Sequence, residues 1–138
     1  MTRDLEKQVE AFYEAFNAGE LDRFLDECDP EVEFDWSESR SPDSAVYTGR
    51  AGVRRFIQQN LELWSDLRLE PEEIVALGDD RALVLVRVRM SGRDGITVEA
   101  RGAHLASFRE GRLLRYKLFQ TPADAFKELG VDEPGMDD

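Results

Sequence analysis

The sequence predicts an α+β fold in which a curved antiparallel β-sheet packs against three N-terminal α-helices, with a short helix after the last strand. Two patterns carry this prediction. Apolar residues recur at intervals of three and four within residues 5–16, 21–28 and 53–64, which is typical of amphipathic helices. From residue 82 onward, apolar and polar residues alternate between short turns, which indicates antiparallel strands. Helices on the concave side of a curved sheet would bury these stripes together and leave an apolar cavity between the layers.

The first two helices are delimited by capping and helix-breaking residues. Thr2 can cap a first helix that ends at Gly19. A shorter helix follows, and Asp29-Pro30 ends it because the residue before a proline is excluded from the helical conformation. The apolar positions are Leu5, Val9, Phe12 and Phe16 in the first helix, with Tyr13 beside them, and Leu21, Phe24, Leu25 and Cys28 in the second.

A strand is expected directly after Pro30. Val32, Phe34 and Trp36 alternate with acidic residues, which is the period of a half-buried strand that ends near Asp35. Residues 37–46 are polar and are expected to form a loop near the mouth of the cavity.

The remaining elements follow from the same periods. Apolar residues between 53 and 64 predict a third helix that begins at Thr48 or Gly49. Strands are then expected over 67–77, 82–91, 96–109 and 112–119. Pro71 indicates an edge strand or a bulge, and Gly102 could mark another bulge. Thr121-Pro122 opens a last short helix that ends at Gly130.

Length and composition predict a single domain over residues 1–131, followed by an acidic tail, 132–138, that we expect to be disordered. The one cysteine cannot form an internal disulfide, and no apolar run is long enough to span a membrane. The N-terminus does not resemble a signal peptide. We therefore expect a soluble, cytoplasmic protein.

Charge and motif content exclude several classes of function. Thirty acidic residues against eighteen basic ones give a net charge of −12, which disfavours nucleic acids and anionic membranes as partners. A single histidine and a single cysteine cannot build a zinc cluster. No glycine-rich phosphate loop or dinucleotide fingerprint occurs, so we expect neither a metal nor a cofactor.

Several motifs together resemble the nuclear transport factor 2-like superfamily and, within it, the SnoaL-like proteins, which are related to ketosteroid isomerase. They are NAGELD, DPEVEFDW, YTGRAGVRRF, HLASFREGRLLR and ADAFKELG, in that order between Leu5 and Gly130. The resemblance implies a cone-shaped α+β fold with a pocket. It does not specify a reaction, because the SnoaL-like group includes aldol cyclases, isomerases and dehydratases.

The motif of ketosteroid isomerase can be compared residue by residue. Asp35 stands where that enzyme has its general base, at the end of the strand after the second helix. The oxyanion tyrosine of ketosteroid isomerase matches Phe12 in this sequence, although Tyr13 is adjacent. The protonated acid of that enzyme matches Ala103, immediately before His104. Both oxyanion donors are therefore missing at their matched positions, so we do not expect that specific activity.

Asp35 and His104 are the candidate catalytic residues. Asp35 could be a general base if it faced the pocket, but simple alternation places it on the opposite face from Phe34, where it would be a solvated strand-end residue. His104 is the only histidine and shares its face with Ala106 and Phe108. It could be a proton donor or acceptor, or a hydrogen-bonded core residue.

Five further residues are candidates for contact with a ligand, with ordinary core packing as the alternative for each. They are Trp36, Tyr47, Trp64, Met90 and Tyr116.

The leading functional hypothesis is a cofactor-independent enzyme of lyase or isomerase type that uses acid–base chemistry on a small apolar substrate. The alternatives are a non-catalytic module that binds a small ligand, and a dimerisation or partner-binding domain. Basic residues at odd positions of three strands, from Arg87 to Lys117, should lie on the outer face of the sheet. That face, and the resemblance, suggest a homodimer formed through the sheet.

Overall fold

The computed structural model describes residues 2–37, 45–78, 80–92, 95–119 and 121–130. The predicted tail, 132–138, and most of the predicted loop, 37–46, lie outside these ranges. The elements, in chain order, are α1 (Thr2–Asn17), α2 (Leu21–Asp26), β1 (Cys28–Asp35), β2 (Val46–Thr48), α3 (Gly49–Leu63), β3 (Trp64–Ala76), β4 (Arg81–Gly92), β5 (Thr97–Arg109), β6 (Arg112–Phe119) and α4 (Pro122–Leu129).

The predicted α+β class is confirmed, and the differences lie at the ends of elements. Cys28, predicted on the second helix, is instead the first residue of β1, because the helix ends at Asp26. The short strand β2 begins at Val46, the last residue predicted as loop, and runs to Thr48, which was predicted as a possible start of the third helix. At the C-terminus, Thr121 caps α4 by accepting a hydrogen bond from the Asp124 N–H, and Gly130 ends the helix with a φ of 66°.

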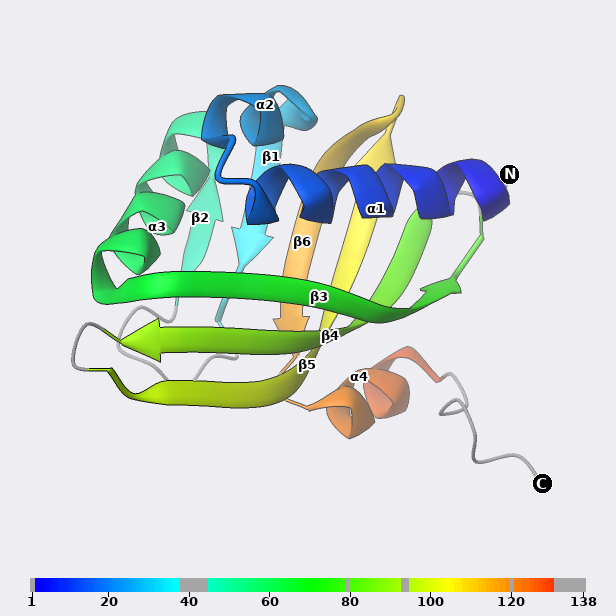
Figure 1. Ribbon diagram of the computed structural model, residues 1–138. Coiled ribbons are helices and arrows are strands. Elements are labelled where there is room, and N and C mark those ends of the chain that lie inside the picture. The colour runs from blue at the N-terminus through cyan, green and yellow to red at the C-terminus, as the bar shows by residue number, and fades with distance from the viewer. Residues whose placement is uncertain (1, 38–44, 79, 93–94, 120, 131–138) are drawn as a thin grey trace.

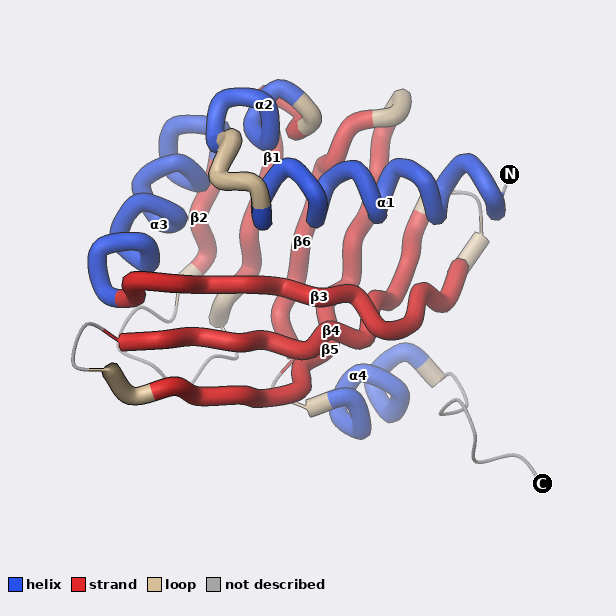
Figure 2. Tube along the Cα trace, viewed as in Figure 1, coloured by secondary structure: helices blue, strands red, loops and turns tan. Residues whose placement is uncertain are grey.

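All six strands form one sheet in the order β2-β1-β6-β5-β4-β3 (Figure 1). Neighbouring strands are antiparallel except for β1 and β6, which run parallel. The long strands β3, β4 and β5 curve, and α1 lies alongside β3 and crosses in front of β4, β5 and β6, so the sheet has a concave face that carries α1, α2 and α3 (Figure 2). We call the opposite side the outer face.

Each face of the sheet has its own hydrophobic core. The larger core lies between the concave face and the first three helices and includes Phe12, Phe34, Val84 and Tyr116. The smaller one lies on the outer face, where α4 covers Leu83, Ala103 and Phe119 with its own apolar residues. Neighbouring residues Leu83 and Val84 belong to different cores because successive side chains of a strand point to opposite faces.

Register confirms one predicted irregularity and corrects another. The pairing of β3 with β4 shifts between Pro71 and Glu73, and β3 is the edge strand, as Pro71 indicated. The pairing of β4 with β5 runs without a shift past Gly102, which faces Val86, so the prediction of a bulge there was wrong. Within the described residues, no helix is both long enough and apolar enough to cross a membrane.

Asn17, the last residue of α1, attaches that helix to the edge of the sheet. Its side-chain Nδ2 donates to the carbonyl oxygen of Leu69 at 2.7 Å, and its Oδ1 accepts from the Leu69 N–H at 2.9 Å. Leu69 lies in β3, whose outward backbone groups have no neighbouring strand. The amide of Asn17 therefore pairs with this strand much as another strand would.

Replacing this amide should loosen α1 from the sheet. We expect Asn17→Ala to lower the free energy of unfolding by about 1 to 3 kcal/mol, because two partly buried backbone groups lose their partners. Urea unfolding followed by circular dichroism measures this change. Asn60→Ala is the matched control, since Asn60 bonds only to the Phe56 carbonyl within its own helix. Equal losses in the two variants would contradict the role assigned to Asn17.

Candidate functional site

Three polar side chains meet in the middle of the larger core. The hydroxyl of Tyr13 lies 2.7 Å from the hydroxyl of Tyr116 and 3.1 Å from Nδ1 of His104. The Tyr116 hydroxyl is also hydrogen-bonded to Nδ1 of His104. All three residues are at most 2% exposed. Polar groups buried so completely are stable only when they are hydrogen-bonded, and these three supply one another's partners.

Helix α1 and two neighbouring strands bring these residues together. Tyr116 of β6 lies opposite Ala106 of β5, so its ring stands beside that of His104, two residues away along β5, with 4.7 Å between ring centroids. Tyr13 reaches them from α1. Aromatic rings surround the cluster. Phe12 and Phe34 contact Tyr116 at centroid distances of 5.3 and 4.9 Å.

Burial determines the charge of all three groups. It lowers the pKa of His104 from 6.5 to about 3 and raises the pKa of Tyr13, against a smaller opposite effect of the hydrogen bond to Tyr116. Burial also raises the pKa of Tyr116 well above its ordinary value, and the nearby Tyr13 raises it further. At neutral pH the cluster is therefore a neutral imidazole with two neutral phenols.

Counting hydrogens determines the tautomer of His104. If Nδ1 is unprotonated, Tyr13 can donate to Tyr116 and Tyr116 to Nδ1, and both hydroxyl hydrogens find acceptors. If Nδ1 carries the hydrogen, one tyrosine hydroxyl has no acceptor left within the cluster. The first arrangement avoids a buried unsatisfied donor, so we assign the imidazole hydrogen to Nε2. His104 thus presents an N–H donor on the side of its ring away from the tyrosines.

This Nε2–H group has no hydrogen-bond partner within the described part of the chain, although His104 is only 2% exposed. Outside the cluster, the ring of Trp36 lies beside the imidazole, with 5.7 Å between the two ring centroids. Trp36 is half-buried and follows directly after β1. The result is a single hydrogen-bond donor in apolar surroundings, next to a partly exposed aromatic side chain.

Asp35 lies elsewhere. Its carboxylate accepts hydrogen bonds from the backbone N–H and hydroxyl of Ser37 and lies 3.5 Å from Nη2 of Arg115, on the outer face. Burial acts to raise the pKa of Asp35, but the bonds from Ser37 and the charges of Lys117 and Arg115 outweigh it and hold that pKa below its usual range. The structure does not bring Asp35 and His104 together. This agrees with the alternation of β1, which placed Asp35 on the face opposite Phe34.

Of the other predicted contact residues, Trp36 and Tyr116 lie beside His104. Tyr47 is half-buried and packs on Phe56 with ring centroids 4.4 Å apart. Met90 is half-buried near the far end of β4, opposite Leu67 and Val98. The side chain of Trp64 lies outside the described part of the structure.

Tyr13 was missed as a site residue because it lies beside the apolar stripe of its helix rather than on it. It is nevertheless as buried as Phe12. Ala103 matches the protonated acid of ketosteroid isomerase, but its side chain packs in the smaller core on the outer face. The side chain of His104, the next residue, points to the concave face. A signal in the sequence did exist. Tyr13 carries a hydroxyl group, is adjacent to the matched position Phe12, and is buried in the same core.

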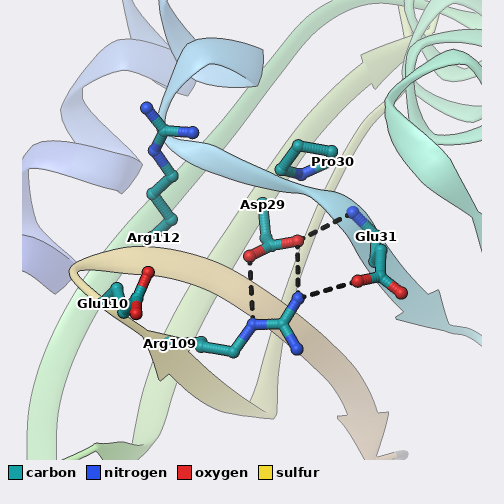
Figure 3. A pocket seen from close by; sticks show the side chains of 6 residues that line it. All are labelled: Asp29, Pro30, Glu31, Arg109, Glu110 and Arg112. Atoms are coloured by element: carbon teal, nitrogen blue, oxygen red, sulfur yellow. Dashed lines mark hydrogen bonds and ion pairs between the residues drawn. The ribbon is translucent and has the colours of Figure 1, made fainter.

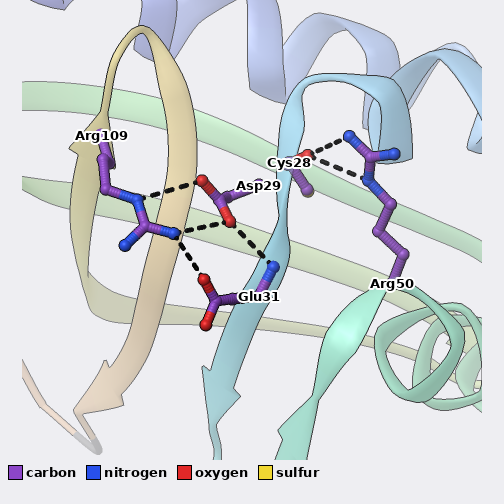
Figure 4. Close-up of polar contacts among 5 residues, drawn as sticks. All are labelled: Cys28, Asp29, Glu31, Arg50 and Arg109. Atoms are coloured by element: carbon purple, nitrogen blue, oxygen red, sulfur yellow. Dashed lines mark hydrogen bonds and ion pairs between the residues drawn. The ribbon is translucent and has the colours of Figure 1, made fainter.

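Two hollows lie away from this cluster, at the end of the sheet near the β5–β6 turn. The larger, of about 790 Å³, is polar and open, and Figure 3 shows its six lining residues. Arg109 spans it, bonding both carboxylate oxygens of Asp29 at 3.0 and 3.2 Å and Glu31 at 3.0 Å (Figure 4). These bonds hold the pKa of Asp29 below its usual range. The smaller, of about 240 Å³, lies between α1 and that turn.

The neutral buried imidazole makes stability depend on pH. In the unfolded chain His104 binds a proton below about pH 6.5, whereas in the folded protein it does so only near pH 3. The stabilisation is complete above pH 6.5 and is lost as the pH falls, by about 1.4 kcal/mol per pH unit. We expect urea unfolding between about pH 6.5 and 5 to show this slope, and His104→Gln to lack it. Equal slopes in both proteins would contradict the assignment.

Comparison with known proteins gives a consistent result. A model of the SnoaL-like domain matches residues 9–116. A search of curated proteins gives no match.

Among solved structures, TerC co-crystallised with polyporic acid is 23% identical, with a TM-score of 0.75, and 91% of this chain and 97% of that one are covered. A protein assigned as a polyketide cyclase, from Xanthomonas campestris pv. campestris, is 21% identical, with a TM-score of 0.73 and coverage of 92% and 97%. A Mycobacterium tuberculosis protein in complex with estradiol-17beta-hemisuccinate is 15% identical, with a TM-score of 0.74 and coverage of 86% and 94%. The family match spans more than half of the sequence, and the likenesses extend over nearly the whole fold, so the chain belongs to the SnoaL-like domain family.

Proposed function

We propose that this protein holds a small, mostly apolar compound against the concave face and acts on it as a cofactor-independent enzyme of lyase or isomerase type. The observation that carries the proposal is the Nε2–H of His104, a donor that has no partner among the described residues and is not sealed from solvent, although the residue as a whole is only 2% exposed. Such a donor is stable when a bound molecule supplies the acceptor. The ligand would therefore carry an oxygen acceptor, such as a carbonyl or a phenolate, on an apolar body.

The cluster suits an oxygen atom that gains negative charge during a reaction. The hydroxyls of Tyr13 and Tyr116 are hydrogen-bonded to each other and to Nδ1 of His104, so the imidazole is already oriented before a ligand arrives. A fixed donor aimed at the oxygen stabilises a developing enolate more than the carbonyl from which it forms. Because His104 is neutral, it would act as a hydrogen-bond donor rather than as an imidazolium acid.

The ligands of the structural neighbours agree with this chemistry. Polyporic acid and the estradiol derivative were bound by proteins of the same fold, and another neighbour is assigned as a polyketide cyclase. These two compounds were bound by the neighbouring proteins, not by this one. For this chain they support only the expectation of an apolar ligand with oxygen substituents.

A non-catalytic binding module is the second candidate, and the position of Asp35 favours it. Proton abstraction needs a base, yet within the described residues no carboxylate is recorded as a hydrogen-bond or ion-pair partner of His104. Asp35 would have to leave Ser37 and Arg115 and reach the concave face to be that base. If it remains where it is, the cluster would bind a ligand without removing a proton from it.

The single histidine allows a direct test of ligand binding. Protein labelled with ¹⁵N-histidine should give one pair of imidazole signals, with the proton on Nε2. Addition of 2-naphthol should shift the protonated signal, because its oxygen accepts from that N–H. We expect Tyr116→Phe to weaken 2-naphthol binding by roughly 10-fold, about 1.4 kcal/mol, because the imidazole loses the group that orients it. Ser107→Ala, on the other face of β5, is the matched control.

The same experiment separates the two candidates. Turnover of a carbonyl compound that falls by at least ~10² in Asp35→Asn, with binding unchanged, would support the enzyme with Asp35 as its base. Binding without turnover, unaffected by Asp35→Asn, would support the binding module. Imidazole signals that stay unchanged at millimolar 2-naphthol would contradict both.

We also propose that two copies associate through the outer face. α4 covers one part of that face and leaves a polar part exposed over β3, β4 and β5. There Arg87 and Arg101 bond Glu72, each at 3.3 Å, and Arg89 bonds Glu99 at 3.4 Å. Alternating charges of this kind can pair with the same surface of a second copy related by a two-fold axis.

Charge reversal in this polar area should weaken association. Arg101 is 68% exposed, so Arg101→Glu should leave the fold intact while placing a third acidic group beside Glu72 and Glu99. Light scattering at micromolar concentration should give twice the chain mass for the natural protein and a lower mass for this variant. Arg55→Glu, an equal change of charge on α3, should remain dimeric. A natural protein that is monomeric over this range would contradict the proposal.

A further inference from the structure

Gly102 lies over empty space on the concave face. The residue is buried, yet a Cβ atom added to it would meet no atom of the described residues within 4 Å. Its φ lies outside the positive region, so the backbone does not require glycine there. Glycine weakens the interior of a strand because it adds flexibility and no packing. The fold therefore gains nothing from glycine at this position, and what glycine provides is room.

This space adjoins the free donor of His104. Gly102 and His104 are two residues apart on β5 and share the concave face, a separation of about 6.6 Å along the strand. Nδ1 of His104 is directed toward Tyr116, which lies beside Ala106, on the side away from Gly102. The opposite edge of the imidazole ring therefore faces the Gly102 end of the strand.

The walls of this space are apolar. Gly102 pairs with Val86 on β4, and the next inward residues, the exposed Ala100 and the half-buried Val88, face each other. An apolar group attached to an oxygen acceptor fits this space, because the oxygen can bond to Nε2–H while the apolar part covers Gly102.

We propose that Gly102 sets the upper size limit of the ligand, and that the space above it receives a second ring or a comparable apolar extension of a molecule anchored at His104. This inference rests on the proposed function, because it assumes a ligand at Nε2. It adds that the ligand extends beyond its oxygen-bearing group into the space above Gly102. Gly102 would be a specificity-determining residue that contacts the ligand only through its backbone.

Side chains of increasing size at Gly102 provide the test. Phenol and 2-naphthol are the probes, and their dissociation constants are measured from the ¹⁵N signals of His104. In the natural protein 2-naphthol should bind more tightly than phenol. Gly102→Leu should weaken 2-naphthol by at least ~10-fold and phenol by less than ~3-fold, and Gly102→Ala should give a smaller change in the same direction. Thr97→Leu, on the opposite face of β5, should change neither.

Thermal unfolding of the same variants keeps the test valid. Gly102→Ala should melt no lower than the natural protein, since its methyl group meets no atom. If Gly102→Leu does not fold, the test rests on Gly102→Ala, which should weaken the binding of 2-naphthol more than the binding of phenol. Equal weakening of both probes, or none, would overturn the role of Gly102 while leaving His104 as the anchor. If neither probe shifts the His104 signals, the proposed function fails, and this inference fails with it.

Discussion

The hydrogen bonds among Tyr13, Tyr116 and His104 are the constraint on which this structure most depends. An unpartnered phenol or imidazole in an apolar interior costs more than one hydrogen bond returns, so the three groups must meet with accurate geometry or not be buried at all. They come from α1, β5 and β6, and their contact fixes the position of the first helix relative to the middle of the sheet. Asn17 then fixes the end of that helix on Leu69.

The same contact gives the concave face its chemical character. Both phenols are engaged within the cluster, so they influence a ligand only through the imidazole that they orient. A neutral N–H donor surrounded by aromatic rings favours an acceptor that is itself apolar apart from one oxygen. Two buried carboxylates, by contrast, are held by partners outside the cluster: Asp35 bonds Ser37 on the outer face, and Asp29 bonds Arg109 near the β5–β6 turn.

Local patterns in the sequence predicted the helices, the long strands and the edge position of Pro71, because each depends on residues a few positions apart. The pairing of β1 with β6 could not be predicted in this way, since it joins residues about eighty positions apart. Tyr13 was missed for a similar reason. Its helical position alone did not show that Tyr116 and His104 would meet its hydroxyl. Gly102 was assigned to a bulge because glycine often marks one, and only the unbroken register showed that it leaves space instead.

The order of the strands also has a consequence for how this protein is made. β1 is translated early, yet its parallel partner is β6, the last strand, and β6 also supplies Tyr116 to the buried cluster. Until β6 leaves the ribosome, β1 has one edge open, and Tyr13 and His104 lack one of their partners. The nascent chain must therefore carry an incomplete core until β6 has been synthesised, and adding β6 joins strands that are far apart in the sequence.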